Sequence, residues 1–314
     1  MKLAMVFPGQ GSQAIGIMNA YGDFPEVLRT IDEASGILGQ DIGKLIAEGP
    51  AEELNRTVNT QPVMVTAGVA VYRMWLAMGG PRPEVLAGHS LGEYSALVAA
   101  GGVSFRDAVG LVQKRGRYMS EAVPPGTGQV AALLGLTPDV VREVCREASA
   151  AGVVAAANFN SPGQVVIAGE KAAVERAIEL AKGKGCKKAI PLPVSVPVHT
   201  PLMQVAADRL SNDLAAVKWT DLAMPLINNA EAKPISRAAE IQPSLVRQLP
   251  SSVLWEDSVQ AMAKMGVTTF IEVGPGTVLT GLIKRILPDA KLLNVHDPKS
   301  LDATLQALGA AHPA

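Results

Sequence analysis

Ser90 lies between two glycines, where an apolar run of the sequence meets a helix-forming run. Residues 85–102 read VLAGHSLGEYSALVAAGG. A strand, a tight Gly-His-Ser-Leu-Gly turn and a helix are the setting of a nucleophile elbow, in which glycines make room for the turn and the hydroxyl is held at the positive end of the helix. The G-x-S-x-G pattern alone is weak in a chain with 30 glycines. The strand before it and the helix after it favour a serine nucleophile over an inert strand–helix turn.

A nucleophilic serine needs a general base, and the sequence contains four histidines. His312 lies close to the chain end, where segments fray. His89 precedes the serine on a sharp turn that makes neighbouring side chains diverge, so we expect it to line the pocket or to support the structure. The candidates for the base are therefore His199, in SVPVHTPLM, and His296, in NVHDP.

The two candidate bases predict different enzymes. An α/β-hydrolase with the order serine, acid, histidine favours His296, although the Asp-Pro that follows it also suits a surface turn. His199 lies between two prolines directly before a predicted helix, which holds it rigidly. The only aspartates between Ser90 and His199 are Asp107 and Asp139, and both fall in first turns of helices, where the helix dipole accounts for them. A backbone or amide carbonyl would then have to orient the ring.

Arg115 lies on the apolar face of a helix predicted over residues 104–122. The other members of that face follow i, i+3, i+4 spacing: Phe105, Ala108, Val109, Val112, Gly116 and Met119. Lys114 and Arg117 point away from it. A buried guanidinium needs a partner. Two interpretations stay open: an ion pair with an internal carboxylate, or a fork that binds a substrate carboxylate through two parallel hydrogen bonds.

Composition excludes several classes of protein. The 314 residues are 48% hydrophobic, which indicates a globular chain with a large core, and a net charge of −1 gives no electrostatic basis for nucleic-acid binding. Cys145 and Cys186 are too few for a disulfide framework and have no metal-binding spacing, so we expect buried free thiols and no metal site. The longest apolar run is broken by Arg73, and the apolar N-terminal stretch is too short for a signal peptide. We therefore expect a soluble, cytoplasmic protein that does not bind a membrane.

Short apolar runs alternate with longer helical patterns, which predicts an α/β fold: a hydrolase-like, mainly parallel sheet with helices on both faces. The predicted strands are residues 3–7, 84–88, 225–229, 268–273 and 291–295. The predicted helices are residues 60–79, 104–122, 200–217, 253–265 and 277–287.

A different order of elements occupies the middle of the chain. A strand and a helix come first, then two strands joined by a turn at residues 160–163, then a second helix and a last strand. This βαββαβ order is that of a ferredoxin-like unit. We expect a small ferredoxin-like subdomain over residues 126–196, inserted into a large catalytic subdomain formed by residues 1–125 and 197–314.

Five motifs occur in one order along the chain. They are Phe7-Pro8-Gly9-Gln10-Gly11-Ser12-Gln13, Gly88-His89-Ser90-Leu91-Gly92-Glu93, Arg115-Gly116, Pro197-Val198-His199 and Gly274-Pro275-Gly276. On these motifs the sequence resembles the malonyl-CoA:acyl carrier protein transacylases, and the match covers essentially the whole chain. The family fold is also a hydrolase-like α/β subdomain with a ferredoxin-like insert.

The resemblance implies roles for particular residues. Ser90 would be the nucleophile, His199 its general base and acid, and Arg115 the group that binds the malonyl carboxylate, which leaves His296 a structural role. The other implied roles are an oxyanion hole, the pocket wall, and a carbonyl that fixes the tautomer of the histidine. The N–H groups of Gln10 and Leu91 would form the oxyanion hole. The pocket wall would include Gln61, Met119 and Asn160. The backbone carbonyl of Gln248 would accept a hydrogen bond from the histidine and fix its tautomer.

The implied reaction is ping-pong transfer of malonyl from malonyl-CoA to the phosphopantetheine thiol of acyl carrier protein, in fatty acid biosynthesis. No permanently bound cofactor is expected, and the protein is expected to be a monomer. One alternative is the acyltransferase subunit of a malonate decarboxylase, which uses the same residues. Another is a serine thioesterase that relies on His296. A carrier-binding scaffold without activity is disfavoured because Ser90, His199 and Arg115 are all present.

An acidic carrier protein requires a basic docking face, and the sequence offers two candidates. One is the cluster Lys182, Lys184, Lys187 and Lys188, at the end of the small subdomain. The other is the pair Lys284 and Arg285. For both, an ordinary solvated surface is the alternative interpretation.

Overall fold

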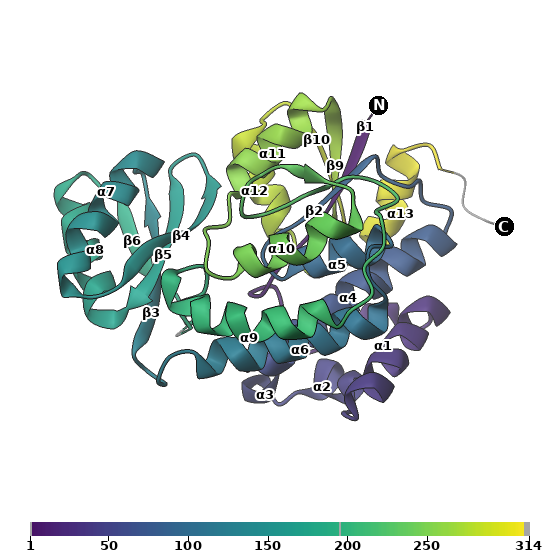
Figure 1. The fold of residues 1–314 in the computed structure, drawn as a ribbon. Coiled ribbons are helices and arrows are strands. Elements are labelled where there is room, and N and C mark those ends of the chain that lie inside the picture. Colours follow the sequence, from purple (N-terminus) through teal and green to yellow (C-terminus); the bar gives the residue numbers. More distant parts are fainter. Residues whose placement is uncertain (1, 195, 311–314) are drawn as a thin grey trace.

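The computed structural model describes residues 2–194 and 196–310, which form two sheets and the helices around them. Figure 1 shows the smaller sheet and its two helices, in teal, beside the rest of the chain. No helix of the described chain is both long and apolar enough to cross a membrane.

The larger sheet has six strands. In spatial order they are β10 (Lys291–Val295), β9 (Val267–Val273), β1 (Lys2–Phe7), β2 (Val85–Gly88), β7 (Leu226–Ile227) and β8 (Pro234–Ile235). Neighbouring strands are parallel, except that β8 runs antiparallel to β7 at the edge. The central strands are continuous apolar runs because helices cover both of their faces.

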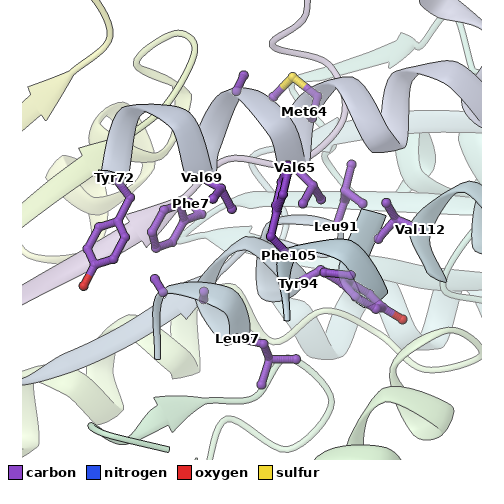
Figure 2. Packing of buried hydrophobic residues seen from close by; sticks show 14 of the residues in the cluster. Phe7, Met64, Val65, Val69, Tyr72, Leu91, Tyr94, Leu97, Phe105 and Val112 are labelled. Atoms are coloured by element: carbon purple, nitrogen blue, oxygen red, sulfur yellow. The ribbon is translucent and has the colours of Figure 1, made fainter. Parts of the chain in front are cut away.

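Alternate residues of β1 belong to different cores, since successive side chains of a strand point to opposite faces. Leu3, Met5 and Phe7 pack into the larger core, and Ala4 and Val6 into the smaller one. Figure 2 shows part of the larger core, with side chains from β1 and the covering helices.

The helices divide between the two faces according to the core that they join. The smaller core includes α11 (Trp255–Lys264) and α12 (Val278–Ile286). The larger core includes α1 (Pro25–Leu38), α2 (Ile42–Glu48), α3 (Ala51–Asn55), α4 (Thr57–Ala77), α5 (Gly92–Ala99), α6 (Phe105–Glu121), α9 (Gln204–Ala215), α10 (Ala238–Gln248) and α13 (Pro298–Ala307).

The smaller sheet is antiparallel. Its spatial order is β4 (Val154–Ser161), β5 (Gln164–Glu170), β3 (Gly128–Leu134) and β6 (Lys188–Pro191). Helices α7 (Pro138–Ala148) and α8 (Lys171–Gly183) pack in one core with one face of this sheet. The other face presents small and branched side chains, among them Val130, Ala132 and Val166.

A short segment before α11 joins the two sheets. Val253 forms a parallel bridge with Asn158 of β4: its N–H donates to Ala157 O, and its carbonyl accepts from Phe159 N–H, each at 2.9 Å. The Ser252 hydroxyl donates to the Ala156 carbonyl at 2.6 Å. The next residue, Leu254, donates its N–H to the carbonyl of Asn229, just after β7, at 2.9 Å, so this segment ties the edge strand β4 to the large sheet.

The α/β fold class is confirmed, including the small antiparallel sheet with βαββαβ order. The strand expected over 225–229 is only two residues long, and the helix expected over 200–217 begins with a 3-10 turn, Pro201–Met203. Helices α1–α3, α10 and α13 were not predicted. The division into subdomains at residues 126 and 196 stays a prediction; the small sheet itself runs from Gly128 to Pro191.

Candidate active site

Ser90 lies on the sharp turn between β2 and α5, and its backbone is left-handed, with φ of 51°. This conformation is costly for a side chain other than glycine, and such strain is concentrated at functional sites. A Cβ on Gly88 would lie 2.0 Å from the backbone of Gly92, and one on Gly92 would lie 2.1 Å from Phe7 O. The two flanking glycines are therefore required by close backbone contacts.

Asn229, just after β7, holds the turn from the neighbouring strand. Its Oδ1 accepts from Ser90 N–H at 2.6 Å, and its Nδ2 donates to the Gly88 carbonyl at 2.7 Å. The side-chain amide of Asn229 thus satisfies two backbone groups of the turn that have left the regular hydrogen bonding of the sheet. Sequence reasoning missed this residue; the only signal was a pair of asparagines at the end of an apolar run.

His199 contacts the serine from a separate segment of the chain. Ser90 Oγ lies 2.6 Å from His199 Nε2, and the histidine also has a left-handed backbone, with φ of 61°. His199 Nδ1 lies 2.9 Å from Gln248 O and 3.1 Å from Ser251 O. Carbonyl oxygens only accept, so Nδ1 carries the proton and Nε2 is free to accept from the serine hydroxyl. Burial, and then the positive charge of Arg115, lower the pKa of His199 to about 3, so the ring is neutral at pH 7.

Arg115 is 1% exposed and its hydrogen-bond partners are all neutral. Its Nη1 donates to Gln61 Oε1 at 2.9 Å, and its Nη2 donates to Gln248 Oε1 at 3.1 Å and to Ser90 Oγ at 3.3 Å. No ion pair of Arg115 with a carboxylate occurs within residues 2–194 and 196–310. Of the two interpretations left open, the internal ion pair is therefore wrong.

Gln248, at the end of α10, connects the parts of the site. Its backbone carbonyl accepts from His199, and its side-chain oxygen accepts from Arg115. Its Nε2 donates to Ser90 O at 2.9 Å and to Glu93 Oε2 at 2.8 Å. The sequence resemblance pointed to the carbonyl alone; the side-chain contacts had no sequence signal because α10 was not predicted.

A cavity of about 330 Å³ opens above Ser90 between the two sheets. Polar groups at its base include Ser90, His199 and Arg115. Its walls are mostly apolar: the small sheet contributes Val130, Ala132 and Val166, and α12 contributes Val278, Leu279 and Leu282. Such a cavity suits an apolar or extended ligand with one charged end.

Four of the other predicted residues line this cavity: Gln10, Leu91, Met119 and Asn160. Within the described chain, the backbone N–H groups of Gln10 and Leu91 donate to no protein acceptor. Gln61, expected in the pocket wall, is not among the residues that line the cavity, and its role in substrate binding stays a prediction. It is 1% exposed and lies behind Arg115, where it also donates to Met119 Sδ at 3.1 Å, because α4 and α6 pack closely there.

Neither His89 nor His296 hydrogen-bonds Ser90 Oγ. His89 lines the cavity, hydrogen-bonds Asn160 Oδ1 at 2.8 Å and packs against the Trp255 ring at 5.4 Å between centroids. His296 hydrogen-bonds Asn294 Oδ1 at 2.6 Å, and the Asp297 after it caps α13 instead of forming a plain turn. His312 lies outside the described residues.

Both cysteines are free thiols, although only Cys145 is buried; Cys186 is half-buried, because β6, which follows it, is an edge strand. Among the described residues, no three His, Cys, Asp or Glu side chains are grouped so as to hold a metal ion.

The site combines a serine on a strand–helix elbow, a neutral histidine in contact with it and backbone N–H groups without partners at the same cavity. These features define an enzyme that transfers or hydrolyses acyl groups through a serine nucleophile. Residues 4–300 match the model of the acyl transferase domain, and the chain belongs to this family.

Its relatives are similar over nearly their whole length. The malonyl CoA-acyl carrier protein transacylase of Escherichia coli (strain K12) is 50% identical over 97% of this chain and 99% of that protein. An acyl-carrier-protein S-malonyltransferase structure from Burkholderia pseudomallei 1710b has a TM-score of 0.96 and 55% identity over 98% of this chain and 100% of that one. A malonyl-transacylase in complex with a type II PKS acyl-carrier protein has a TM-score of 0.96 and 46% identity over 98% of this chain and 100% of that one.

His199 is expected to stay neutral across the physiological range. Its pKa is lowered from 6.5 to about 3, so it contributes stability that is present above pH 6.5 and is lost as the pH falls toward 3. Long-range ¹⁵N NMR between about pH 5 and pH 8 should show a neutral ring with the proton on Nδ1, assigned by comparison with His199→Gln. Protonation of this ring between pH 6 and pH 7 would contradict the buried, Arg115-facing geometry.

Proposed function

We propose that the protein transfers a malonyl group from malonyl-CoA to the phosphopantetheine thiol of an acyl carrier protein, through a malonyl-Ser90 intermediate, in fatty acid biosynthesis. The observation that carries this proposal is Arg115: a buried guanidinium that forms no direct ion pair with a carboxylate of the described chain and lies 3.3 Å from the hydroxyl of Ser90. A carboxylated acyl group would supply the missing charge. The names of the relatives, which combine malonyl transfer with a carrier protein, support the same substrate.

In the first half-reaction His199 Nε2 takes the proton of Ser90 Oγ, and the oxygen attacks the thioester carbonyl of malonyl-CoA. The N–H groups of Gln10 and Leu91 stabilise the oxyanion that forms, and Leu91 precedes α5, whose dipole adds to this effect. The C–S bond then breaks, His199 returns the proton to the CoA sulfur, and the malonyl ester of Ser90 remains.

The second half-reaction is the reverse with a different thiol. His199 takes the proton of the phosphopantetheine thiol, and the sulfur attacks the malonyl-serine carbonyl. The ester bond breaks and Ser90 regains its proton from His199. One thioester is consumed and another formed, so the free-energy change is small and the reaction is reversible.

Arg115 accounts for acyl selection in this scheme. The planar guanidinium can present two parallel N–H donors to a carboxylate when its 3.3 Å contact with Ser90 Oγ is exchanged for the substrate. An acetyl group would leave the guanidinium without an anionic partner in a cavity with mostly apolar walls, and loss of such a partner discriminates by orders of magnitude. The contact between Arg115 and the acyl carboxylate also orients the acyl ester for attack by the thiol. The apolar walls of the cavity limit the access of bulk water.

Product analysis tests the proposed function. The protein is incubated with malonyl-CoA with and without a holo-acyl carrier protein, and acyl-enzyme, acyl-carrier and free malonate are measured together. We expect a malonyl adduct on Ser90 without carrier, rapid loss of that adduct to the carrier, and little free malonate. Ser90→Ala should form no adduct. Free malonate as the main product would instead indicate a thioesterase, and an adduct that survives in Ser90→Ala would contradict the assigned nucleophile.

Between the two basic clusters, the geometry favours Lys284 and Arg285 as the docking surface for the carrier. Arg285 Nη1 donates to Gln164 Oε1 at 2.6 Å, and Gln164 lines the cavity. Val278, on the same helix, also lines the cavity and is 56% exposed. In the other cluster, Lys184 is already paired with two glutamates, Glu143 and Glu147.

Charge reversal distinguishes the two surfaces. Lys284→Glu with Arg285→Glu should raise KM for the carrier roughly tenfold or more and leave KM for malonyl-CoA within about twofold, because surface charges mainly steer association. The matched control, Lys182→Glu with Lys187→Glu, should leave both constants near those of the parent chain. A larger carrier effect from the control pair would place docking on the small sheet.

A further inference from the structure

Glu93 is a buried carboxyl group that the proposed mechanism does not use. It lies in the first turn of α5, three residues after Ser90, and is 0% exposed. Its Oε2 accepts from Gln248 Nε2 at 2.8 Å and from Asn229 N–H at 3.1 Å. Its Oε1 has no hydrogen-bond partner among the described residues. A fully buried oxygen without a donor disfavours the ionised form of the group.

The Gln248 side chain links Glu93 to Arg115. One end of this amide donates to the carboxyl group, and the other end accepts from the guanidinium. Because Glu93 accepts from the NH₂ end, it fixes which end of the amide faces Arg115. The two charged groups are thus separated by a single amide, close enough in a buried site for each to act on the charge of the other.

The groups that face Glu93 come from four elements. Arg115 on α6 is the charged one, and Tyr94, its neighbour on α5, has its pKa raised to about 12 by burial and is neutral. Gln248 from α10 and Asn229 after β7 face it with N–H donors. The balance of charge around Arg115 in the free enzyme therefore depends on the protonation of Glu93.

We infer that Glu93 is the internal counter-charge of Arg115 and that a carboxylated acyl group binds at Arg115 together with uptake of one proton from solvent by Glu93. This inference rests on the proposed function. An ionised Glu93 and a substrate carboxylate on either side of one guanidinium leave a net negative charge in a buried site, which is costly. Protonation at Oε1, where no donor is displaced, restores neutrality and keeps both hydrogen bonds to Oε2.

The pKa of Glu93 allows it to gain or lose this proton near neutral pH. Burial raises the pKa of Glu93 from 4.5 to about 7, while the hydrogen bonds from Gln248 and Asn229 and the charge of Arg115 lower it. Below pH 7 the free enzyme already holds the proton, so binding takes up none. Above pH 7 the proton must be acquired, so affinity for a carboxylated acyl group falls as the pH rises. Acetyl groups bring no charge and are indifferent to Glu93.

Calorimetry on the Ser90→Ala chain measures the proton directly. Malonyl-CoA and acetyl-CoA are titrated into it in buffers of different ionisation enthalpy, and the dependence of the heat on the buffer gives the protons taken up. Acetyl-CoA carries the same CoA group and subtracts any uptake that belongs to it. We expect an excess of nearly one proton for malonyl-CoA at about pH 8 and almost none at about pH 6. The dissociation constant of malonyl-CoA should rise by about tenfold per pH unit above pH 7.

A Glu93→Gln change assigns the proton to this residue. The new amide can keep its oxygen at the Oε2 position and so accept both existing hydrogen bonds. In Ser90→Ala with Glu93→Gln, malonyl-CoA should show no excess uptake and should bind with the same affinity at pH 6 and pH 8. Glu121→Gln, which removes an exposed carboxylate paired with Arg209, is the matched control and should keep the excess proton.

The outcomes separate this inference from the proposed function. Equal proton uptake for malonyl-CoA and acetyl-CoA at pH 8 overturns the inference. This test uses no substitution at Glu93, so it can be made even if Glu93→Gln does not fold. An excess that persists in Glu93→Gln also overturns it. Failure of the proposed function has a different signature, since malonyl-CoA would then bind Ser90→Ala and Ser90→Ala with Arg115→Ala equally well.

Discussion

The site depends on a guanidinium that is buried without a carboxylate beside it. Desolvating a cation is expensive unless hydrogen bonds and a nearby negative charge offset the cost. Arg115 donates hydrogen bonds to Gln61, Gln248 and Ser90, but these partners are neutral. The protein thus holds a cation next to the nucleophile without satisfying its charge by direct contact, which leaves an anionic acyl group as the partner that fits.

Long-range contacts around one glutamine keep this arrangement in place. Gln248 accepts from His199 Nδ1 through its backbone carbonyl and from Arg115 through its side-chain oxygen, and its Nε2 donates to the Ser90 carbonyl. Its helix, α10, therefore holds together three segments that are far apart in the sequence. Asn229 supports the elbow from the neighbouring strand. Helices and loops around the large sheet supply these polar groups, while the free face of the small sheet and α12 supply the apolar walls of the cavity.

Local patterns were enough to predict much of this. The glycines around Ser90, the apolar stripe through Arg115 and the βαββαβ rhythm each follow from short-range geometry, and each agrees with the structure. The contacts that tune the site were not predictable. Gln248 and Asn229 act across more than a hundred residues, Glu93 reads as one more polar residue at a helix start, and Gln61 was placed in the wall because nothing in the sequence shows how closely α4 and α6 pack.

The most direct test of the account removes the guanidinium and compares two acyl groups. For Arg115→Ala, kcat/KM is measured with malonyl-CoA and with acetyl-CoA, and Lys114→Ala, an exposed neighbour on the same helix, is the control. The account predicts that malonyl transfer falls by about a thousandfold, while acetyl transfer is unchanged or rises. An equal loss with both substrates would show that Arg115 supports the structure and does not select the acyl group.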